Sequence, residues 1–312
     1  MKLTLFFAIV FAAFMTTEAG AWDGKGHMMV AAIAYDNLDK TTVRPKVDAL
    51  IKLNPMYSTW IRNVAPADRG KVAFVYAATW PDLIKSDKKH FKDDGEDPAK
   101  SPDPAQNVGY KPKGTYMHRY WHFVDEPFSS DDTPLQSPKT PNAQTQIAVF
   151  RQVLASNSED QGLKSYDLVW LEHLVGDVHQ PLHATSRFTK DLPDGDRGGN
   201  LVTIPSACYH ELHCYWDNVK GQTKSATAAI TAASKLQKAD KSSSSQLDEK
   251  IWIDESFTVA KESVYKDPPI GPTGAGPYTL TVAYKTNAQK IAAERIALAG
   301  ARLANVLNEA LK

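Results

Sequence analysis

The feature that most constrains the fold of this chain is residues 163–183, a helical segment that carries potential metal-ligand side chains. Its apolar residues recur every three or four positions, which predicts a helix with a buried stripe: Leu168, Leu171, Val175 and Val178. His173 and Asp177 are four residues apart, so both project from one face of that helix. Pro181 cannot continue a regular helix, so the chain turns and can bring His183 beside them. Two imidazoles and a carboxylate that converge in this way predict a zinc site.

A second pair of residues repeats this spacing. His213 and Asp217 are also four residues apart, in the sequence HCYWD. One such pair arises easily by chance on a solvated helix face. Two pairs in one chain, with His183 between them, indicate a metal centre.

The first 21 residues predict a cleaved secretory signal peptide. Lys2 gives a short positive start, residues 3–14 are almost entirely apolar, and Ala19-Gly20-Ala21 has the small-x-small cleavage pattern. The apolar run is too short to span a bilayer, and no other stretch comes close. We therefore expect no membrane anchor, and a secreted or periplasmic protein that consists of residues 22–312.

Cleavage after Ala21 would expose the α-amine of Trp22 close to His27. A free α-amine has a pKa of about 7.7–8.0, so its neutral form is reachable near neutral pH and can bind a metal ion. Gly24 and Gly26 allow the chain to fold back, so that the amine and His27 reach the same ion.

Export also places the two cysteines in an oxidising compartment. Cys208 and Cys214 are six residues apart and are the only cysteines in the chain. This favours a small-loop disulfide. A thiolate metal pair is the alternative, although a zinc site usually brings its cysteines closer together in the sequence.

The rest of the chain is mostly helical in its pattern. Helices are predicted over residues 28–38, 41–53, 67–84 with a bend at Pro81, 143–154 and 286–311. Residues 86–115 are rich in Lys, Asp, Pro and Gly and predict a long exposed loop. A turn-rich region, 184–215, contains one β-like run at 201–204, and the Ser-rich residues 242–245 predict a loop. We expect an all-α single domain with long loops, present as a monomer.

The charge balance limits how this chain can bind nucleic acid. Lys+Arg and Asp+Glu each total 36, so the formal net charge is zero. A protein that binds nucleic acid by coating phosphates normally has a basic excess. Any nucleic-acid chemistry here would therefore draw positive charge from bound metal ions.

Six motifs in order resemble one known family. They are Trp-x-Gly-x-Gly-His from Trp22, Trp-x-Asp-x-Ile-Lys around Asp82, His-Phe-x-Asp from His122, His-x-x-Gly-Asp-x-x-Gln-Pro-Leu-His from His173, Gly-Gly-Asn ending at Asn200, and Leu-His-x-x-Trp-Asp-Asn ending at Asn218. Together they resemble the single-strand-specific zinc nucleases of the S-one/P-one nuclease family, which share a helical fold with zinc phospholipase C. The resemblance covers essentially the whole of residues 22–312.

Carried over position by position, the resemblance implies three zinc ions. The implied ligands are Asp82, His122, His173 and Asp177 for the first ion, the amine and carbonyl of Trp22 with His27 and a share of Asp177 for the second, and His183, His213 and Asp217 for the third. His118 lies four residues before His122, but the His-Phe-x-Asp context favours His122 as the ligand. His179 comes two residues after Asp177, so on a helix it points elsewhere.

The resemblance also implies roles around the substrate. Lys85 would lie near the scissile phosphate, where a cation stabilises developing charge. Phe123 would stack on a base, and Asp125 would accept from base N–H groups. Asn200 and Asn218 match positions near the bound nucleotide. Pro81 departs from the family pattern, and we expect it to bend the helix and shift Asp82.

The implied activity is metal-assisted hydrolysis of single-stranded RNA and DNA to 5′-phosphorylated products, with 3′-nucleotidase activity at the same site. A zinc phospholipase C is the nearest rival enzyme, but its pattern has Glu where this chain has Asp217. A non-catalytic exported zinc-binding protein is the rival of another class, and it predicts a closed coordination shell. The complete ligand set together with Lys85 favours a nuclease.

Overall fold

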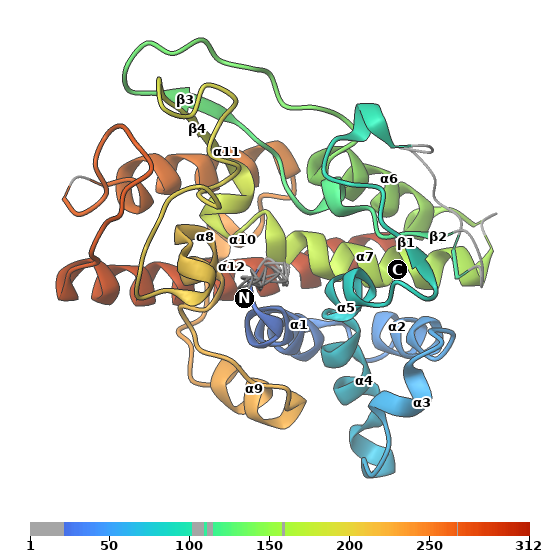
Figure 1. The fold of residues 1–312 in the computed structure, drawn as a ribbon. Helices are drawn as coiled ribbons and strands as arrows, with labels where there is room; N and C mark the ends of the chain where they lie inside the picture. Colours follow the sequence, from blue (N-terminus) through green and yellow to red (C-terminus); the bar gives the residue numbers. More distant parts are fainter. Residues whose placement is uncertain (1–21, 102–108, 111–114, 158–159, 267) are drawn as a thin grey trace, which may run out of the picture.

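The computed structural model describes residues 22–101, 109–110, 115–157, 160–266 and 268–312. The predicted signal peptide, residues 1–21, lies outside these residues, as do two parts of the predicted loop 86–115. The described chain is predominantly helical, which confirms the all-α expectation (Figure 1). None of its described helices combines enough length and apolar character to cross a membrane.

Helices of very different length follow one another along the chain, with two small sheets between them. The α-helices are α1 (Gly24–Asn37), α2 (Val43–Ile51), α3 (Tyr57–Trp60), α4 (Arg69–Ala77), α5 (Trp80–Ser86), α6 (Ala143–Ala155), α7 (Gln161–Asp177), α8 (Leu212–Asp217), α9 (Ala226–Ala233), α10 (Lys241–Ser244), α11 (Glu249–Val259) and α12 (Val282–Ala310). Short 3-10 helices are η1 (Pro66–Asp68), η2 (Pro98–Lys100), η3 (Arg119–His122), η4 (Pro181–Ala184) and η5 (Cys208–His210), and a π-helical turn, η6 (Ala260–Val264), follows α11. The two parallel sheets pair β1 (Phe91–Lys92) with β2 (Thr115–Tyr116) and β3 (Pro127–Ser129) with β4 (Ser186–Phe188).

Helix α7 runs through the centre of the molecule, with α6 on one side and α1 and α2 on the other (Figure 1). It begins where the Asp160 carboxylate accepts hydrogen bonds from the backbone N–H groups of Gly162 and Leu163, at 2.8 and 3.1 Å. All its residues from 164 to 177 are buried, because α1, α2, α5, α6 and α12 surround it. The four residues of the predicted stripe are buried, but so is the rest of this helix, which carries its polar residues into the interior.

The first and last helices of the chain lie side by side (Figure 1). Helix α12 reaches α1 at Gly300, where a Cβ atom would lie 2.6 Å from the Cβ of Ile33 and 2.8 Å from the carbonyl oxygen of Val30. Glycine is therefore the residue that allows this close approach. The contact fixes α1, which carries His27, against the body of the protein.

Residues 67–84 form two helices with a break between them. Helix α4 ends at Ala77 and α5 begins at Trp80. Pro81 lies in the first turn of α5, where a proline removes no helical hydrogen bond. The prediction of one helix bent at Pro81 is wrong, since this proline starts a helix and places Asp82 in the first turn.

Three other local predictions differ from the structure. The β-like run 201–204 is not a strand, because Thr203 makes only an isolated bridge with Glu211, and the strand of this region is β4. The Ser-rich residues 242–245 lie largely in α10, because the Asp240 carboxylate caps that helix by accepting from the N–H of Ser243 at 2.9 Å. The last helix begins at Val282, four residues earlier than predicted.

The two cysteines form the predicted disulfide. Cys208 and Cys214 are joined, with their Cα atoms 5.6 Å apart. The bond ties η5 to α8, the helix that carries His213 and Asp217. Neither sulfur is therefore available as a thiolate metal ligand.

We expect Gly300→Ala to lower the free energy of unfolding by about 1 kcal/mol, measured by urea denaturation. Overpacking a helix contact costs about 1–3 kcal/mol, and the better helix propensity of alanine offsets about 1 kcal/mol of that. Asn287→Ala, at an exposed position of the same helix, is the matched control and should change stability by about 0.5 kcal/mol or less. A Gly300→Ala protein more stable than this control would contradict the role assigned to the glycine.

Candidate metal centre

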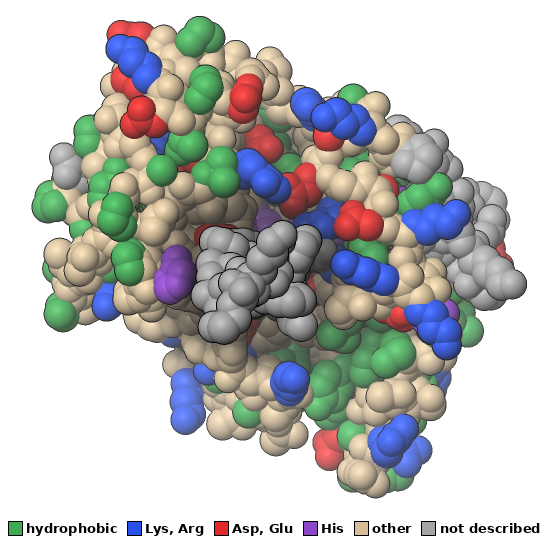
Figure 2. All heavy atoms as spheres, viewed as in Figure 1, with side chains coloured by type: hydrophobic (Ala, Val, Ile, Leu, Met, Phe, Trp, Pro, Cys, Tyr) green, Lys and Arg blue, Asp and Glu red, His purple; other side chains and the backbone are tan. Residues whose placement is uncertain are grey.

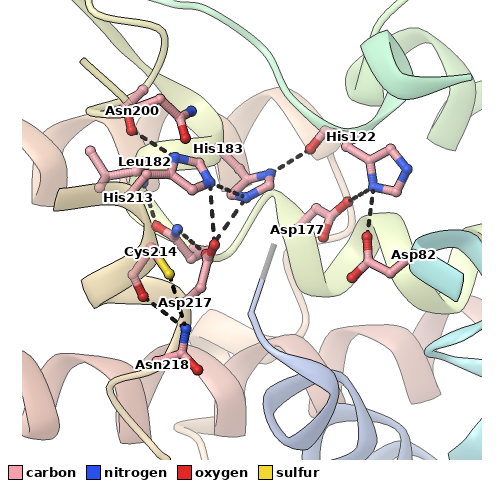
Figure 3. A network of polar contacts seen from close by, with 12 residues as sticks. Asp82, His122, Asp177, Leu182, His183, Asn200, His213, Cys214, Asp217 and Asn218 are labelled. Atoms are coloured by element: carbon pink, nitrogen blue, oxygen red, sulfur yellow. Dashed lines mark hydrogen bonds and ion pairs between the residues drawn. The ribbon is translucent and has the colours of Figure 1, made fainter. Parts of the chain in front are cut away.

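Two histidines and an aspartate converge between η4 and α8. The Nε2 atoms of His183 and His213 are 3.0 Å apart, and the Asp217 carboxylate oxygens lie 3.8 and 3.5 Å from them. The three side chains are almost fully buried. Figure 3 shows the two imidazole rings pointing toward each other and toward Asp217. This geometry matches a site where three ligand atoms surround one ion.

The protonation of the two rings indicates that a cation belongs between them. The Nδ1 atom of His183 lies 2.7 Å from the carbonyl oxygen of His122, and that of His213 lies 2.7 Å from the carbonyl oxygen of Gly198. A carbonyl oxygen only accepts, so both Nδ1 atoms carry hydrogen and both Nε2 atoms present lone pairs. Burial lowers the pKa of His213 to about 4 and that of His183 well below its ordinary value, so both rings are neutral near pH 7. Two lone pairs at 3.0 Å repel each other unless a cation binds both.

A second set of ligand atoms gathers around the end of α7. The Oδ2 atom of Asp177 lies 3.0 Å from Nδ1 of His122 and 3.3 Å from Nε2 of His173. Asp82, from α5, places its Oδ1 atom 3.8 and 3.5 Å from the same two nitrogens. The Nδ1 atom of His173 lies 2.7 Å from the carbonyl oxygen of Ala78, in the break between α4 and α5. That contact fixes the His173 tautomer and directs the lone pair of Nε2 at the two carboxylates.

Asp177 also contacts a third histidine. Its Oδ1 atom lies 3.2 Å from Nε2 of His27, on α1, and the ring of His27 stacks on that of His173 with centroids 3.8 Å apart. The two oxygens of Asp177 therefore face two separate groups of nitrogens. A carboxylate in this position can bridge two ions.

The start of the described chain folds back beside these residues. Trp22 is fully buried, and a Cβ atom at position 26 would lie 2.6 Å from the Cβ of Trp22, so only glycine fits there. Asp23 caps α1 through its carboxylate, and its backbone N–H donates to the carbonyl oxygen of Asp217 at 3.0 Å. In Figure 3 the segment before α1 runs into the space between Asp217 and Asp177. The chain start thus lies beside both groups of ligand atoms.

The carboxyl groups of this centre need a compensating charge. Burial raises the pKa of Asp177 to about 8, with nearby Asp82 adding to the rise, and burial raises the pKa of Asp217 well above its ordinary value. Burial also acts to raise the pKa of Asp82. Lys85, whose Nζ atom lies 2.8 Å from Oδ1 of Asp82, and His173 outweigh burial and hold this pKa well below its ordinary value. Buried carboxylates without cations are costly, so the donor set fits bound metal ions.

Sequence reasoning missed one residue that supports this centre. The Nε2 atom of Gln180 donates to Oδ1 of Asp217 at 2.8 Å, and its Oε1 atom accepts from the N–H of Leu182 at 2.6 Å. Gln180 therefore starts η4 and orients Asp217 with one side chain. The position of Gln180 in the Gln-Pro-Leu-His motif is the sequence feature that could have indicated this role.

Two histidines near these residues lie outside the ligand groups. His118 stacks on Trp121 with centroids 3.7 Å apart and has its Nδ1 atom 3.4 Å from a carboxylate oxygen of Asp94. His179 has its Nδ1 atom 2.7 Å from the carbonyl oxygen of Val175 and its Nε2 atom 3.0 Å from Arg302. Both are buried, and these contacts tie neighbouring segments of the fold together.

A cavity of about 720 Å³ opens onto the centre, with His122, His183, His213 and Lys85 in its wall. Phe123, Asp125 and Asn200 line the same cavity. Burial raises the pKa of Asp125 to about 7, and Asp196 adds to the rise. Asn218 instead donates to the carbonyl oxygen of Cys214 at 2.9 Å and borders a different cavity, beside Lys25 and α9.

Charged residues that the sequence analysis did not single out also line this cavity. They are Asp94, Glu96, Asp97, Lys100, Arg119, Lys139, Asp194, Arg197 and Glu211. On the described surface in Figure 2, basic and acidic side chains lie next to one another rather than in a single basic patch. Nothing in their local sequence distinguishes these residues from ordinary surface charges.

A family model described as S1/P1 nuclease matches residues 22–312. The chain belongs to the S1/P1 nuclease family. Endonuclease 5 of Arabidopsis thaliana is 37% identical over 75 residues, which is 22% of this chain and 22% of that protein. Membership confirms the resemblance to the S-one/P-one nucleases. The family is metal-dependent, and the described residues contain His/Asp clusters that could hold metal ions.

Removal of metal from this S1/P1 nuclease should make its stability fall with rising pH. In the metal-free protein, burial raises the pKa of Asp177 from 3.8 to about 8, so the folded state holds a proton that the unfolded state has lost. The stabilisation is present at low pH and is lost as the pH rises toward about 8. The histidines of the unfolded chain, with a pKa of about 6.5, lose their protons progressively above that pH, so they mask less of this loss as the pH rises toward about 8.

We therefore expect the Tm of the chelator-treated protein to fall between about pH 6.5 and about pH 8. The zinc-loaded protein should show a smaller fall, because a bound cation keeps the ligand carboxylates ionised, whereas Asp125, whose pKa burial raises to about 7, titrates in both forms. The measurement is calorimetric Tm against pH, with chelator and after zinc is restored. Parallel curves for the two forms would contradict a cation at Asp177.

Proposed function

We propose that this S1/P1 nuclease is a secreted three-zinc phosphodiesterase that cleaves single-stranded RNA and DNA to 5′-phosphorylated products. We propose that it also removes the phosphate from 3′-nucleotides. The observation that carries the proposal is that two His/Asp groups adjoin one cavity, one around His183, His213 and Asp217, the other around Asp177. A substrate in this cavity would meet both groups at once.

The proposed ligands divide into three sets, and two of these sets share Asp177. They are Asp82, His122, His173 and Asp177, then the amine and carbonyl of Trp22 with His27 and Asp177, and then His183, His213 and Asp217. Imidazole and carboxylate donors suit zinc. Bound zinc ions would lower the pKa of coordinated water and neutralise charge on the phosphate.

Lys85 supplies a cation from the protein itself. Its ammonium group lines the cavity, and its side chain is only 8% exposed. The Nζ atom lies 2.8 Å from Oδ1 of Asp82, which holds it in place. A positive charge held in the wall of this cavity would stabilise the negative charge that develops on a phosphate during hydrolysis.

Phe123 and Asp125 supply the proposed base site. The ring of Phe123 and the carboxyl group of Asp125 line the same cavity as the ligand histidines. A base must leave its stack to lie on an aromatic ring, and a duplex resists this by a few kcal/mol. This cost is the proposed source of the preference for single strands.

Export and processing belong to the same proposal. Residues 1–21 would be the signal peptide and residues 22–312 the mature nuclease domain. Two observations support a mature chain that starts at Trp22: the family match begins there, and Trp22 is buried beside the turn that carries His27.

We expect Lys85→Met to lower kcat on single-stranded oligonucleotides by about 10²–10³, because one preorganised charge at the reacting phosphate is lost. Zinc content should stay the same, since Lys85 is not a ligand. Lys88→Met, at an exposed position in the turn that follows α5, is the matched control and should retain activity.

The same assay tests the function itself. Single-stranded RNA, single-stranded DNA, duplex DNA and phosphatidylcholine are offered side by side, with detection of 5′-phosphate ends and of free diacylglycerol. We expect rapid cleavage of both single strands, slower cleavage of the duplex and no lipid turnover. Lipid turnover with intact RNA would overturn the proposal in favour of a phospholipase C.

Residues placed before Trp22 should remove one zinc ion. An added Gly-Ser would convert the α-amine into a peptide nitrogen, which is a poor metal ligand, so we expect the zinc content to fall from three ions to two with most activity lost. The measurement is elemental analysis of the purified protein. Gly-Ser added after Lys312 is the control. Three zinc ions and full activity in the N-terminally extended protein would refute the amine as a ligand.

A further inference from the structure

Two arginines at the mouth of the cavity share one carboxylate. Arg119, on η3, has Nη2 at 3.1 Å from Oε1 of Glu96. The guanidinium of Arg197 pairs with Oε2 of the same glutamate. All three residues line the cavity that contains His122 and His213. Glu96 thus joins two cationic groups that come from separate segments of the chain.

Each arginine lies next to one of the two proposed metal groups. Arg119 comes three residues before His122, in the same short helix. Arg197 adjoins Gly198, whose carbonyl oxygen contacts Nδ1 of His213 at 2.7 Å. The two arginines therefore belong to segments that also carry or support proposed ligands, and they line the same cavity as those ligands.

The backbone holds Arg197 in a specific position. Its φ angle is +56°, in the left-handed region that a non-glycine residue rarely adopts. Its N–H donates to Oγ of Ser186 at 3.2 Å. At the next residue, Gly198, a Cβ atom would lie 2.3 Å from the carbonyl oxygen of Leu182, so no side chain fits at that position of the loop. The loop conformation that directs Arg197 is set by its neighbours.

Two guanidinium groups directed at one carboxylate also have the chemistry that binds a phosphate group. The ion pair is open to solvent, since the side chains of Glu96 and Arg197 are 36% and 54% exposed. Exposed ion pairs contribute little to stability, so an incoming anion can replace the glutamate.

We propose that Arg119 and Arg197 form a binding site for a second phosphate of the substrate strand, and that Glu96 occupies this site until the phosphate displaces it. The inference rests on the proposed function, because it requires a nucleic-acid strand in this cavity. The strand would then be held at the scissile phosphate and at one neighbouring phosphate.

The test compares a dinucleoside monophosphate, which has only the scissile phosphate, with a hexanucleotide. For each zinc-loaded protein we take the ratio of the KM for the dinucleoside monophosphate to the KM for the hexanucleotide. Arg197→Gln should lower this ratio by about fivefold, and Glu96→Gln should raise it by about two- to fivefold. For the hexanucleotide, Arg197→Gln should also reduce the slope of log(1/KM) against log salt by about 0.7, the value for one phosphate contact on a single strand.

Arg62→Gln and Glu294→Gln remove the same charges at exposed positions that do not line the cavity, and they should leave the ratio unchanged. Arg119→Gln removes the other arginine of the proposed phosphate site, and it should lower the ratio as Arg197→Gln does. If Glu96→Gln raises both KM values equally, the glutamate only supports the loop and the inference is overturned. Cleavage of both substrates with unchanged ratios in all variants overturns it too, whereas a wild-type protein that cleaves neither substrate overturns the proposed function instead.

Discussion

The charge of Asp177, buried at the end of the central helix, is the constraint on which the rest of the structure depends. One of its oxygens faces His27 at 3.2 Å, and the other faces His122 and His173 at 3.0 and 3.3 Å. Helix α7 is surrounded on all sides, so this carboxylate cannot turn toward solvent. It must either keep a proton or be neutralised by cations, and the surrounding imidazoles offer lone pairs for cations. The helix that organises the core thus also fixes the position of the metal centre.

Breaks and close approaches in the backbone connect this core to the centre. The gap between α4 and α5 exposes the carbonyl oxygen of Ala78, which sets the tautomer of His173. Gly26 allows Trp22 to fold over the first turn of α1, and Gly300 allows α12 to approach α1. Each of these features is small in energy, but each decides where a proposed ligand side chain lies. The precision of the centre therefore depends on places where regular structure stops or where no side chain fits.

The sequence predicted what local periodicity can reveal. Helices α6, α7 and α12 have continuous patterns of three or four residues, and an i,i+4 spacing is enough to bring His173 and Asp177 together. The break at Ala78 was missed because the apolar pattern continues through it, and α10 was missed because its cap, Asp240, outweighs a Ser-rich composition. The cluster of Glu96, Arg119 and Arg197 could not be predicted, because exposed charges carry no local signal and meet only through the tertiary fold. Asn218 borders a different cavity, and its side chain donates to the carbonyl oxygen of Cys214 four residues earlier, at the end of α8.

The zero net charge has a structural counterpart around the cavity. Its basic side chains are paired with acids, as Arg119 is with Asp93 and Glu96, and Lys139 with Asp97. Opposite charges a few ångströms apart cancel at a distance, so the attraction for phosphate is short-range and is screened further by salt. A rigid duplex held outside the cavity would gain little from such a surface. The proposed preference for single strands agrees with this surface, because a flexible strand can bring its phosphates within contact distance of individual cations.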